Sequence, residues 1–403
     1  MNLIEPRPIK EFALGIYDGP HATPKESSDG AIFLGIKNIT DDGRLDFSEI
    51  RFVSEEEFPR WTRRINPSPG DVVFTYEATL HRYAVIPDGF HGCLGRRVAL
   101  IRPDPKKADS RFLLYYFLSR EWRKVVEGYI ITGATVDRIP LEKFPDFPAI
   151  LPKIEVQKEI ASVLSAYDDL IENNRRRMAL LEEAARLLFR EWFVRLRFPG
   201  HEHTRLLHAL PEGWQKATVF DAMQVLSGGT PKTTTPDFWD GEIPFYTPKD
   251  SVTECYVLDT EKHLTELGLN NCNSKLYPKD TIFITARGTV GNLNLAQRPM
   301  AMNQSCYALT GREEIPQKFL FCAMREAIQH FRQHAVGAVF DAIIVDTFKL
   351  IPFVIPNPKL MRSFEETIDP MFCQIETLLQ QDQKLKAARD LLLPRLMSGE
   401  IEV

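Results

Sequence analysis

The sequence lacks the motifs that most nucleotide-dependent enzymes carry. It contains no G-x-x-x-x-G-K-[ST] segment and no Gly-Lys dipeptide at all, which argues against a P-loop ATPase. It also contains no G-x-G-x-x-G segment, the fingerprint of dinucleotide-binding folds. We therefore expect no cofactor in this chain.

Cysteine pairs and long apolar runs are also missing. The six cysteines contain no C-x-x-C spacing, which indicates reduced thiols, most of them packed in cores. No stretch reaches membrane-spanning length, and the first residues have no apolar run typical of a signal peptide. With 403 residues, the chain is long enough for two or three domains. We expect a cytoplasmic protein that does not associate with membranes.

An excess of basic residues is absent too. The chain has 50 Lys and Arg residues against 55 Asp and Glu residues, a formal charge of −5. Composition therefore does not indicate a nucleic-acid partner, which would need basic side chains gathered on one face. Local clusters such as Arg96-Arg97 and the triplet 175–177 exist, and a solvated surface is the ordinary interpretation of each.

What the sequence does contain is an internal repeat with a shift of roughly 205–210 residues. The segment "PGDVVFTYEATL" from Pro69 matches "PKDTIFITARGTV" from Pro278. Further along, Phe144 falls on Phe348 and Pro148 on Pro352. The chain is therefore one unit written twice.

Each unit has the same predicted order of elements. Short β-type runs, broken by Gly, Pro, Asn and Asp, are followed by one short helix and then by a long helix. This order predicts an α+β fold with two domains of irregular, twisted sheets, separated by two long helices that pair with each other. We place the first domain at 1–152, its helical region at 153–198, the linker and second domain at 199–358, and the second helical region at 359–403.

Both long helices carry a heptad pattern. The seam positions of the first are Ile160, Leu164, Tyr167, Ile171, Asn174, Met178, Leu181 and Leu188. Those of the second are Phe364, Ile368, Ile375, Leu378, Leu385 and Leu392. Asn174 either fixes the register of the pair or points outward at an irregularity, and the sequence leaves both open. Asp382 and Arg389 interrupt the second pattern and Pro370 should kink or delay it, so we expect the second helix to be the shorter.

Polar loops at matching places in the two units are candidate DNA contacts. Amide, hydroxyl and guanidinium groups suit base edges and phosphates, and glycines let backbone approach a ligand. In the first unit the candidates are Lys37, Asn38, Tyr76, Thr79 and Arg82. In the second they are Lys249, Thr285, Arg287, Thr289, Asn292, Asn303 and Gln304. The first loop lacks the glycines of the second, which makes transfer of contacts between them doubtful.

Catalytic chemistry has only weak signals. Asp88 with Asp104 fits a loose D…D-x-K nuclease pattern, but the second unit does not repeat it. His201, His203 and His208 could in principle bind a metal, although a polar linker is the more ordinary interpretation. "DPMF" at Asp369 lacks the second proline of the D-P-P-F motif of amino-methylating enzymes and lies on the heptad seam.

Taken together, several segments resemble the specificity subunit of type I restriction-modification systems over the whole length. They include "IYDGPHATPK", "FLGIKNI", "LPKIEVQKEIASVLSAYDDLIENNRRRMALLEEAARLLFREWF", "FPGHE", "LPEGW", "SGGTPKTTTPDFWDGEIPFYTPKD", "ARGTVGNLNLAQRPMAMNQSCYAL" and "RDLLLPRLMSGEI".

The resemblance implies a non-catalytic protein with two target-recognition domains, each reading half of a bipartite site in double-stranded DNA. It implies that the helices form an antiparallel coiled coil, set the unread spacer and dock two modification subunits, which carry S-adenosylmethionine and methylate adenine. Restriction subunits, which use ATP and Mg, would join that complex. Two rival interpretations remain: a coiled-coil scaffold that binds only proteins, and a metal-dependent nuclease that uses Asp88 and Asp104.

Overall fold

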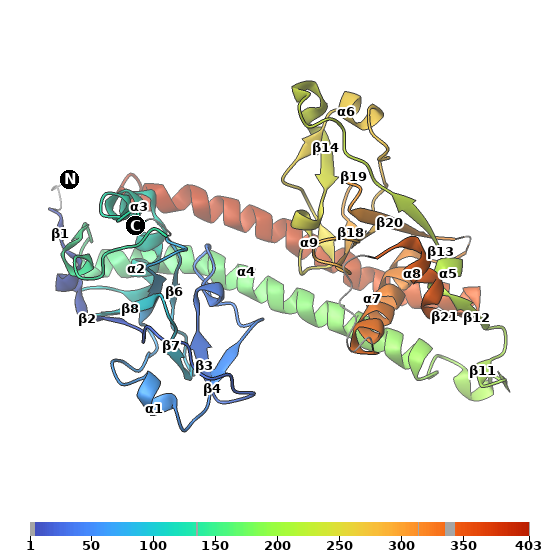
Figure 1. The fold of residues 1–403 in the computed structure, drawn as a ribbon, viewed down its shortest axis with the longest axis horizontal. Helices are drawn as coiled ribbons and strands as arrows, with labels where there is room; N and C mark the ends of the chain where they lie inside the picture. The colour runs from blue at the N-terminus through green and yellow to red at the C-terminus, as the bar shows by residue number, and fades with distance from the viewer. Residues whose placement is uncertain (1–4, 134–135, 313, 335–342, 403) are drawn as a thin grey trace. The chain divides into compact units, whose positions relative to one another are not determined.

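The computed structural model describes residues 5–133, 136–312, 314–334 and 343–402. The chain divides into two compact units (Figure 1). The first unit comprises residues 1–170 and 385–403, and the second comprises residues 171–384. Both division points fall inside long helices, so each long helix contributes to both units. Within the described residues, no helix combines the length and apolar character that a membrane crossing requires.

The described residues of the first unit form two sheets of more than two strands. A four-stranded antiparallel sheet has the order β2-β8-β5-β6, with bounds Ala13–Asp18, Val98–Pro103, Val72–Thr75 and Tyr83–Val85. A three-stranded sheet has the order β4-β3-β7, with bounds Arg51–Val53, Ala31–Leu34 and Gly92–Leu94. The β3–β7 pair is parallel.

The second unit repeats this topology with one added strand. Its larger sheet has the order β13-β20-β17-β18-β15, with bounds Met223–Ser227, Cys306–Gly311, Ile282–Thr285, Leu293–Ala296 and Tyr256–Val257. Its smaller sheet has the order β16-β14-β19, with bounds His263–Leu264, Trp239–Tyr246 and Ala301–Met302. The β14–β19 pair of the smaller sheet, which is equivalent to β3–β7, is also parallel.

The repeated proline and phenylalanine positions explain how each unit closes. In the first unit, β9 (Pro148–Ala149) pairs with β1 (Arg7–Pro8); in the second, β21 (Pro352–Ile355) pairs with β12 (Gln215–Thr218). Phe144 and Phe348, which precede these strands, are buried in the core of their own unit. The last strand of each unit therefore ties its end back to its beginning, directly before a long helix.

The predicted short helix before each long helix differs between the two units. In the second unit it is the single helix α7 (Gln317–His334), but in the first it is divided into α2 (Ser110–Leu118) and α3 (Arg120–Glu127). Ser119 causes the break, because its backbone is extended and its hydroxyl accepts a hydrogen bond from the Trp122 backbone N–H at 3.3 Å. A serine in this role ends one helix and caps the next.

Minor elements complete the chain. The short helices are α1 (Phe58–Trp61), α5 (Val219–Ala222), α6 (Glu266–Asn270) and α8 (Val345–Leu350), and the linker strands are β10 (Leu206–Leu207) and β11 (Leu210–Pro211).

The two long helices are α4 (Ile154–Phe189), which continues into a π-helical turn at Arg190–Val194, and α9 (Pro358–Met397). The two helical segments are nearly equal in length, because α9 has 40 residues and α4 has 36 before its π-helical turn of 5, so Pro370 does not shorten the second helix markedly. Pro370 lies inside α9, and a proline there removes only one backbone donor. The buried neighbours Ile368 and Phe372 keep that turn packed in the core.

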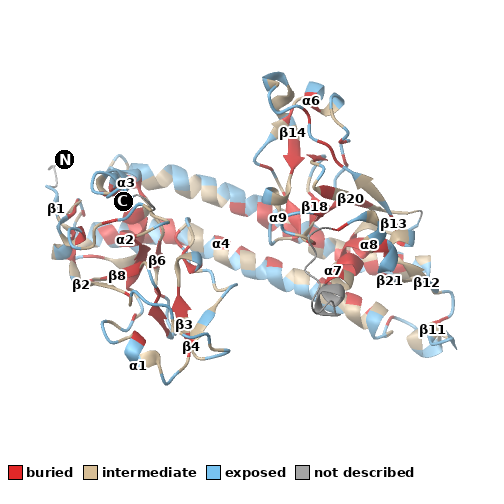
Figure 2. Cartoon of the chain, in the orientation of Figure 1, coloured by how far each residue is buried: buried red, intermediate tan, exposed pale blue. Residues whose placement is uncertain are grey.

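The helices pair in opposite directions within each unit. In the first unit, Ile160 and Leu164 of α4 share a core with Leu396 near the end of α9. In the second unit, Phe189 and Trp192 near the end of α4 contact Phe364 near the start of α9. Figure 2 shows buried residues recurring along both helices between exposed ones. The predicted α+β fold with an antiparallel coiled coil is confirmed.

The predicted seam positions differ in how deeply they are buried. The buried ones are Ile160, Leu164, Ile171, Asn174, Met178, Phe364, Ile368, Ile375 and Leu378. Tyr167, Leu181, Leu188, Leu385 and Leu392 are half-buried. Of the two alternatives for Asn174, the structure has the inward one: its side chain donates to Asp382, and both are buried. Both residues that interrupt the second heptad pattern therefore have polar partners on α4. Asp382 accepts from Asn174, and Arg389 forms an ion pair with Asp168.

Candidate nucleic-acid interface

The loop after β5 and the loop after β17 have the same length, the same closing hydrogen bond and left-handed residues at the same positions. Each contains seven residues, 76–82 in the first unit and 286–292 in the second. Each is closed by the same hydrogen bond, from Thr75 N to Arg82 O at 3.1 Å and from Thr285 N to Asn292 O at 3.0 Å. Arg82 and Asn292 therefore occupy equivalent positions.

Two residues of each loop adopt the left-handed conformation. In the second unit they are Gly288 (φ 82°) and Gly291 (φ 86°); in the first, Ala78 (φ 69°) and His81 (φ 62°) stand at the same places. A left-handed backbone suits glycine and strains other residues. The missing glycines therefore do not signal a different loop, and the equivalence of Thr79 with Thr289 is secure.

A second pair of loops follows β3 and β14 and carries the predicted lysines. In the first unit the Asn38 Oδ1 accepts from Gly35 N at 2.9 Å, and in the second the Asp250 Oδ2 accepts from Thr247 N at 2.8 Å. This shared cap places Lys37 and Lys249 at equivalent positions, one residue before the capping side chain. Both lysines are exposed, Lys37 with 86% of its side chain accessible despite an ion pair with Glu49 at 3.6 Å.

Several predicted residues of the second unit line one hollow of about 460 Å³. Lys249, Arg287 and Asn303 come from three different loops, and the sequence placed them up to 54 positions apart. Lys262, at the rim, adds a third cation that sequence reasoning missed. Gln304, which is exposed, accepts a hydrogen bond from the Thr230 hydroxyl, and Thr230 lines the same hollow.

Other candidates hold the loops rather than face outward. Thr285 is fully buried, and its hydroxyl donates to Thr289 O and accepts from Asn292 N. Asn38 is buried too, and its Nδ2 donates to Asp46 O at 2.9 Å and Glu49 O at 3.0 Å. The structure thus corrects the expected role of these two side chains, because their polar atoms are already used by backbone groups. Asn292 remains half-buried at its loop end.

Tyr76 and Arg82 also sit deeper than expected. Tyr76 is 5% exposed, and burial raises the pKa of its hydroxyl. The guanidinium of Arg82 donates to Ile39 O at 3.1 Å, which ties the 76–82 loop to the loop that carries Lys37. Burial, and then the charge of Arg123, lower the pKa of His81, so its ring adds no positive charge near neutral pH.

Arg82 nevertheless borders a basic hollow of about 330 Å³ in the first unit. Arg120 and Arg123 of α3 line it, together with His81 and one acid, Asp41. No sequence pattern points to the two arginines, because they lie in a helix and not in a polar loop.

Arg96 and Arg97 were noted only as a charge cluster, yet they stand directly before β8. Gln304 and Ser305 hold the same positions before β20, because Val98 pairs with Thr75 as Cys306 pairs with Thr285. Arg96 is exposed, and Arg97 forms an ion pair with Glu77 at 2.8 Å. The matching places of these dipeptides before equivalent strands are the feature that could have marked Arg96 as a candidate DNA contact.

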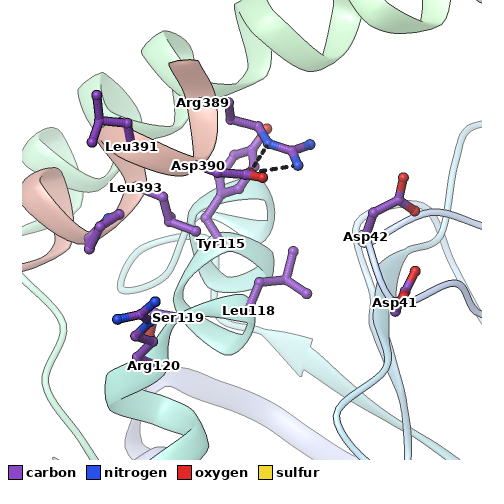
Figure 3. Close-up of a pocket in the computed structure, with 11 residues that line it drawn as sticks. Asp41, Asp42, Tyr115, Leu118, Ser119, Arg120, Arg389, Asp390, Leu391 and Leu393 are labelled. Atoms are coloured by element: carbon purple, nitrogen blue, oxygen red, sulfur yellow. Dashed lines mark hydrogen bonds and ion pairs between the residues drawn. The ribbon is translucent and has the colours of Figure 1, made fainter. Parts of the chain in front are cut away.

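Another hollow of the first unit, about 590 Å³, has a different character (Figure 3). It lies between α2, the start of α3, the turn at Asp41 and the end of α9. Of its two guanidinium groups, that of Arg389 is already engaged by Asp168 at 2.5 Å and Asp390 at 2.8 Å, and Arg120 also borders the basic hollow. Leu118, Leu391 and Leu393 line the rest, as at a seam between packed elements.

The weak catalytic signals find no supporting arrangement. Among the described residues, no cluster of three or more His, Cys, Asp or Glu side chains could hold a metal ion. Asp88 is exposed in a turn, whereas Asp104 accepts from Lys106 N at 3.1 Å and closes its own turn. Asp369 forms an ion pair with Lys318 of α7.

Two repeated α+β units with polar loops at equivalent strand ends, built on an antiparallel coiled coil, define a modular recognition protein. The family model of the type I restriction modification DNA specificity domain matches residues 26–183 and again residues 211–364, and the chain belongs to this family. It is thus a non-catalytic subunit that supplies DNA sequence specificity, as predicted. The scaffold and nuclease alternatives are not favoured.

Individual relatives agree with the family assignment. The chain is 25% identical to the type I restriction enzyme MjaIX specificity subunit of Methanocaldococcus jannaschii, over 98% of this chain and 89% of the relative. It is 28% identical to the EcoR124I/EcoR124II specificity subunit of Escherichia coli, over 62% and 61%. The crystal structure of an S subunit from M. genitalium covers 98% of this chain and 97% of its own, with a TM-score of 0.55 at 18% identity, and has the same fold.

Proposed function

We propose that each unit reads one half of a bipartite site in double-stranded DNA, with the loops after β3, β5 and β7 in the first unit and after β14, β17 and β19 in the second. The observation that carries this proposal is the duplicated interface: equivalent lysines and seven-residue loops on one repeated topology. A protein that reads two half-sites needs two copies of one binding surface.

The contacts are assigned to exposed or half-buried residues of these loops. In the first unit they are Lys37, Thr79 and Arg82, with Arg96 added; in the second they are Lys249, Arg287, Thr289, Asn292, Asn303 and Gln304, with Lys262 added. Tyr76, Asn38 and Thr285 hold the loops in shape. The domain limits at 152, 198 and 358 belong to the same proposal.

The long helices take the remaining roles, as spacer and as docking surface for two modification subunits. In the first unit α4 exposes Val156, Val163 and Leu170, and in the second it exposes Leu180 and Leu187, at intervals of seven residues within each set. Such apolar rows suit a helical partner. The relatives' names call them subunits of restriction enzymes, which supports a partner that brings the catalytic machinery.

On this proposal, S-adenosylmethionine belongs to the modification subunits, and ATP and Mg to restriction subunits that join them. A role in reading genomic DNA places the chain in the cytoplasm.

The experiment is a genome-wide map of methylated adenines in cells that hold this gene and its modification partner, and in cells without this gene. We expect a split motif that disappears with the gene. A continuous motif would contradict two half-sites, and the absence of gene-dependent methylation would contradict the role in modification.

A further inference from the structure

The two units provide an alignment inside one molecule. Their strand registers and loop closures match residue for residue, so side chains at equivalent positions can be compared directly. Two half-sites of different sequence share one feature, the sugar-phosphate backbone, and differ in their base edges. A surface residue that is identical at equivalent positions of both units therefore suits a contact with the sugar-phosphate backbone. A surface residue that differs between the units suits a contact with base edges.

Few surface residues are identical at equivalent positions. Lys37 matches Lys249 through the shared loop cap, and the half-buried Thr79 matches the exposed Thr289 within the seven-residue loops. The tripeptide Thr-Pro-Lys occurs in both units, at residues 23–25 after β2 and 230–232 after β13, but the first copy lies two residues farther from its strand, so the two copies are not at equivalent positions. Its lysines and threonines are exposed in both copies.

A glycine directly after β2 and another directly after β13 occupy equivalent positions. A Cβ on Gly19 would lie 2.6 Å from Gly95 O, and a Cβ on Gly228 would lie 2.2 Å from Asn303 O. In each unit a glycine thus lets the start of the Thr-Pro-Lys loop pass directly over the strand end that precedes the Arg96 or Gln304 position. The Thr-Pro-Lys loop and the differing residues therefore belong to one surface.

Differing residues occupy the positions between them. Glu77 stands where the second unit has Arg287, and Arg96 stands where it has Gln304. Each change exchanges one hydrogen-bonding preference for another: carboxylates accept from cytosine, arginine donates to guanine, and glutamine suits adenine.

We infer that the DNA-facing residues divide into two sets. Lys37 and Lys249 bind phosphates of both half-sites alike. Arg96 in the first unit, and Arg287 and Gln304 in the second, read bases. This inference rests on the proposed function and states which of its contacts carry sequence information.

The test compares Lys249→Ala with Arg287→Ala in the full chain assembled with its modification partner. Both residues line the same hollow of the second unit, so distance from the DNA does not distinguish them. Lys216→Ala, an exposed lysine on β12 of the same unit and outside that hollow, is the matched control. The measurements are affinity for cognate and unrelated duplexes over a salt series, and the methylated motif.

We expect Lys249→Ala to weaken binding to both duplexes by the same factor, to lower the slope of log affinity against log salt by about one, and to leave the motif unchanged. We expect Arg287→Ala to weaken only cognate binding, by roughly tenfold, and to relax one base position in one half-site. The control should match the native chain in every measurement.

A motif altered by Lys249→Ala, or a sequence-independent loss with Arg287→Ala, overturns the division while leaving the proposed function intact. Failure of the native complex to prefer any duplex overturns the proposed function itself. Circular dichroism of each variant separates these outcomes from misfolding.

Discussion

Asn174 of α4 and Asp382 of α9 form a hydrogen bond inside the coiled coil of the second unit. The Asn174 Nδ2 donates to the Asp382 Oδ1 at 2.8 Å, and the two side chains are 7% and 5% exposed. A buried polar pair on a seam is satisfied in only one alignment of the two helices. Sequence position alone had left open whether Asn174 points inward.

Loss of this bond should destabilise the second unit. We expect Asn174→Ala to lower the free energy of unfolding by about 1–3 kcal/mol, because the buried Asp382 carboxylate loses a donor. Replacing both residues by leucine should restore or exceed native stability, since apolar pairs pack without desolvation cost. Urea denaturation of the three chains checks this order, and equal midpoints for Asn174→Ala and the native chain would refute it.

A second prediction concerns alkaline stability in the first unit. The Tyr115 hydroxyl donates to the Asp168 Oδ2 at 2.5 Å, and burial followed by the Asp168 charge raises its pKa above the ordinary value of 10. Between pH 10 and the higher folded pKa, the unfolded chain loses this proton while the folded chain keeps it. The contribution is therefore complete below pH 10 and falls as pH rises, by about 1.4 kcal/mol per pH unit.

Tyr115→Phe removes this titration. We expect its free energy of unfolding to fall less steeply between pH 10 and 11 than that of the native chain, whose other buried tyrosines remain as a common background. Urea unfolding at pH 9, 10 and 11 gives both slopes. Parallel slopes would mean that Tyr115 ionises alike in both states.

Two glycines of the second unit should respond very differently to substitution by alanine. At Gly288 an added Cβ meets nothing nearer than 3.9 Å, so only the left-handed backbone opposes it, at a cost of about 1 kcal/mol. At Gly228 the Cβ would lie 2.2 Å from a backbone oxygen that cannot yield. We expect Gly228→Ala to lose much more stability than Gly288→Ala, as thermal unfolding would show, and the reverse order would contradict the loop geometry.

The exposed apolar rows of α4 predict where partners dock. Leu187→Glu places a charge on the row of the second unit, and we expect at least about tenfold weaker binding to the modification partner with unchanged thermal stability. Leu267→Glu, on α6, is the control because Leu267 is similarly exposed, at 51% against 48%. Calorimetric titration measures both, and equal affinities for the two variants would remove α4 from the interface.

The role of the helices as a spacer can be tested by insertion. One extra heptad in both α4 and α9 adds about 10 Å of helix, or about three base pairs of DNA, while the seam keeps its phase. We expect the unread spacer of the methylated motif to lengthen and both half-sites to stay the same. Insertion in α4 alone should misalign the seam and abolish methylation. A changed half-site would count against a spacer role.

The repeat, the long helices and the loops with DNA-contact candidates could be predicted because their signals are local or periodic. The seam pattern from Ile160 to Leu188 follows from heptad spacing, and the Pro69 and Pro278 segments are visibly related. The break at Ser119 was missed, because one capping hydroxyl decides it within a continuous apolar run. That α9 continues through Pro370 could not be predicted, because core packing outweighs the one donor lost there.

By itself, then, the sequence determined the architecture. The heptad pattern and the internal repeat are both properties of residue order, so they can be recognised without knowing which distant residues are in contact. Only the tertiary structure decided which polar side chains are available. Asn38 and Thr285 resemble DNA-contacting residues in the sequence, but their polar atoms are hydrogen-bonded to backbone groups. Arg96, Arg120 and Lys262 look ordinary, yet folding brings them to the loops of their own units. Whether a side chain is satisfied or exposed depends on atoms from distant segments, and no local pattern encodes it.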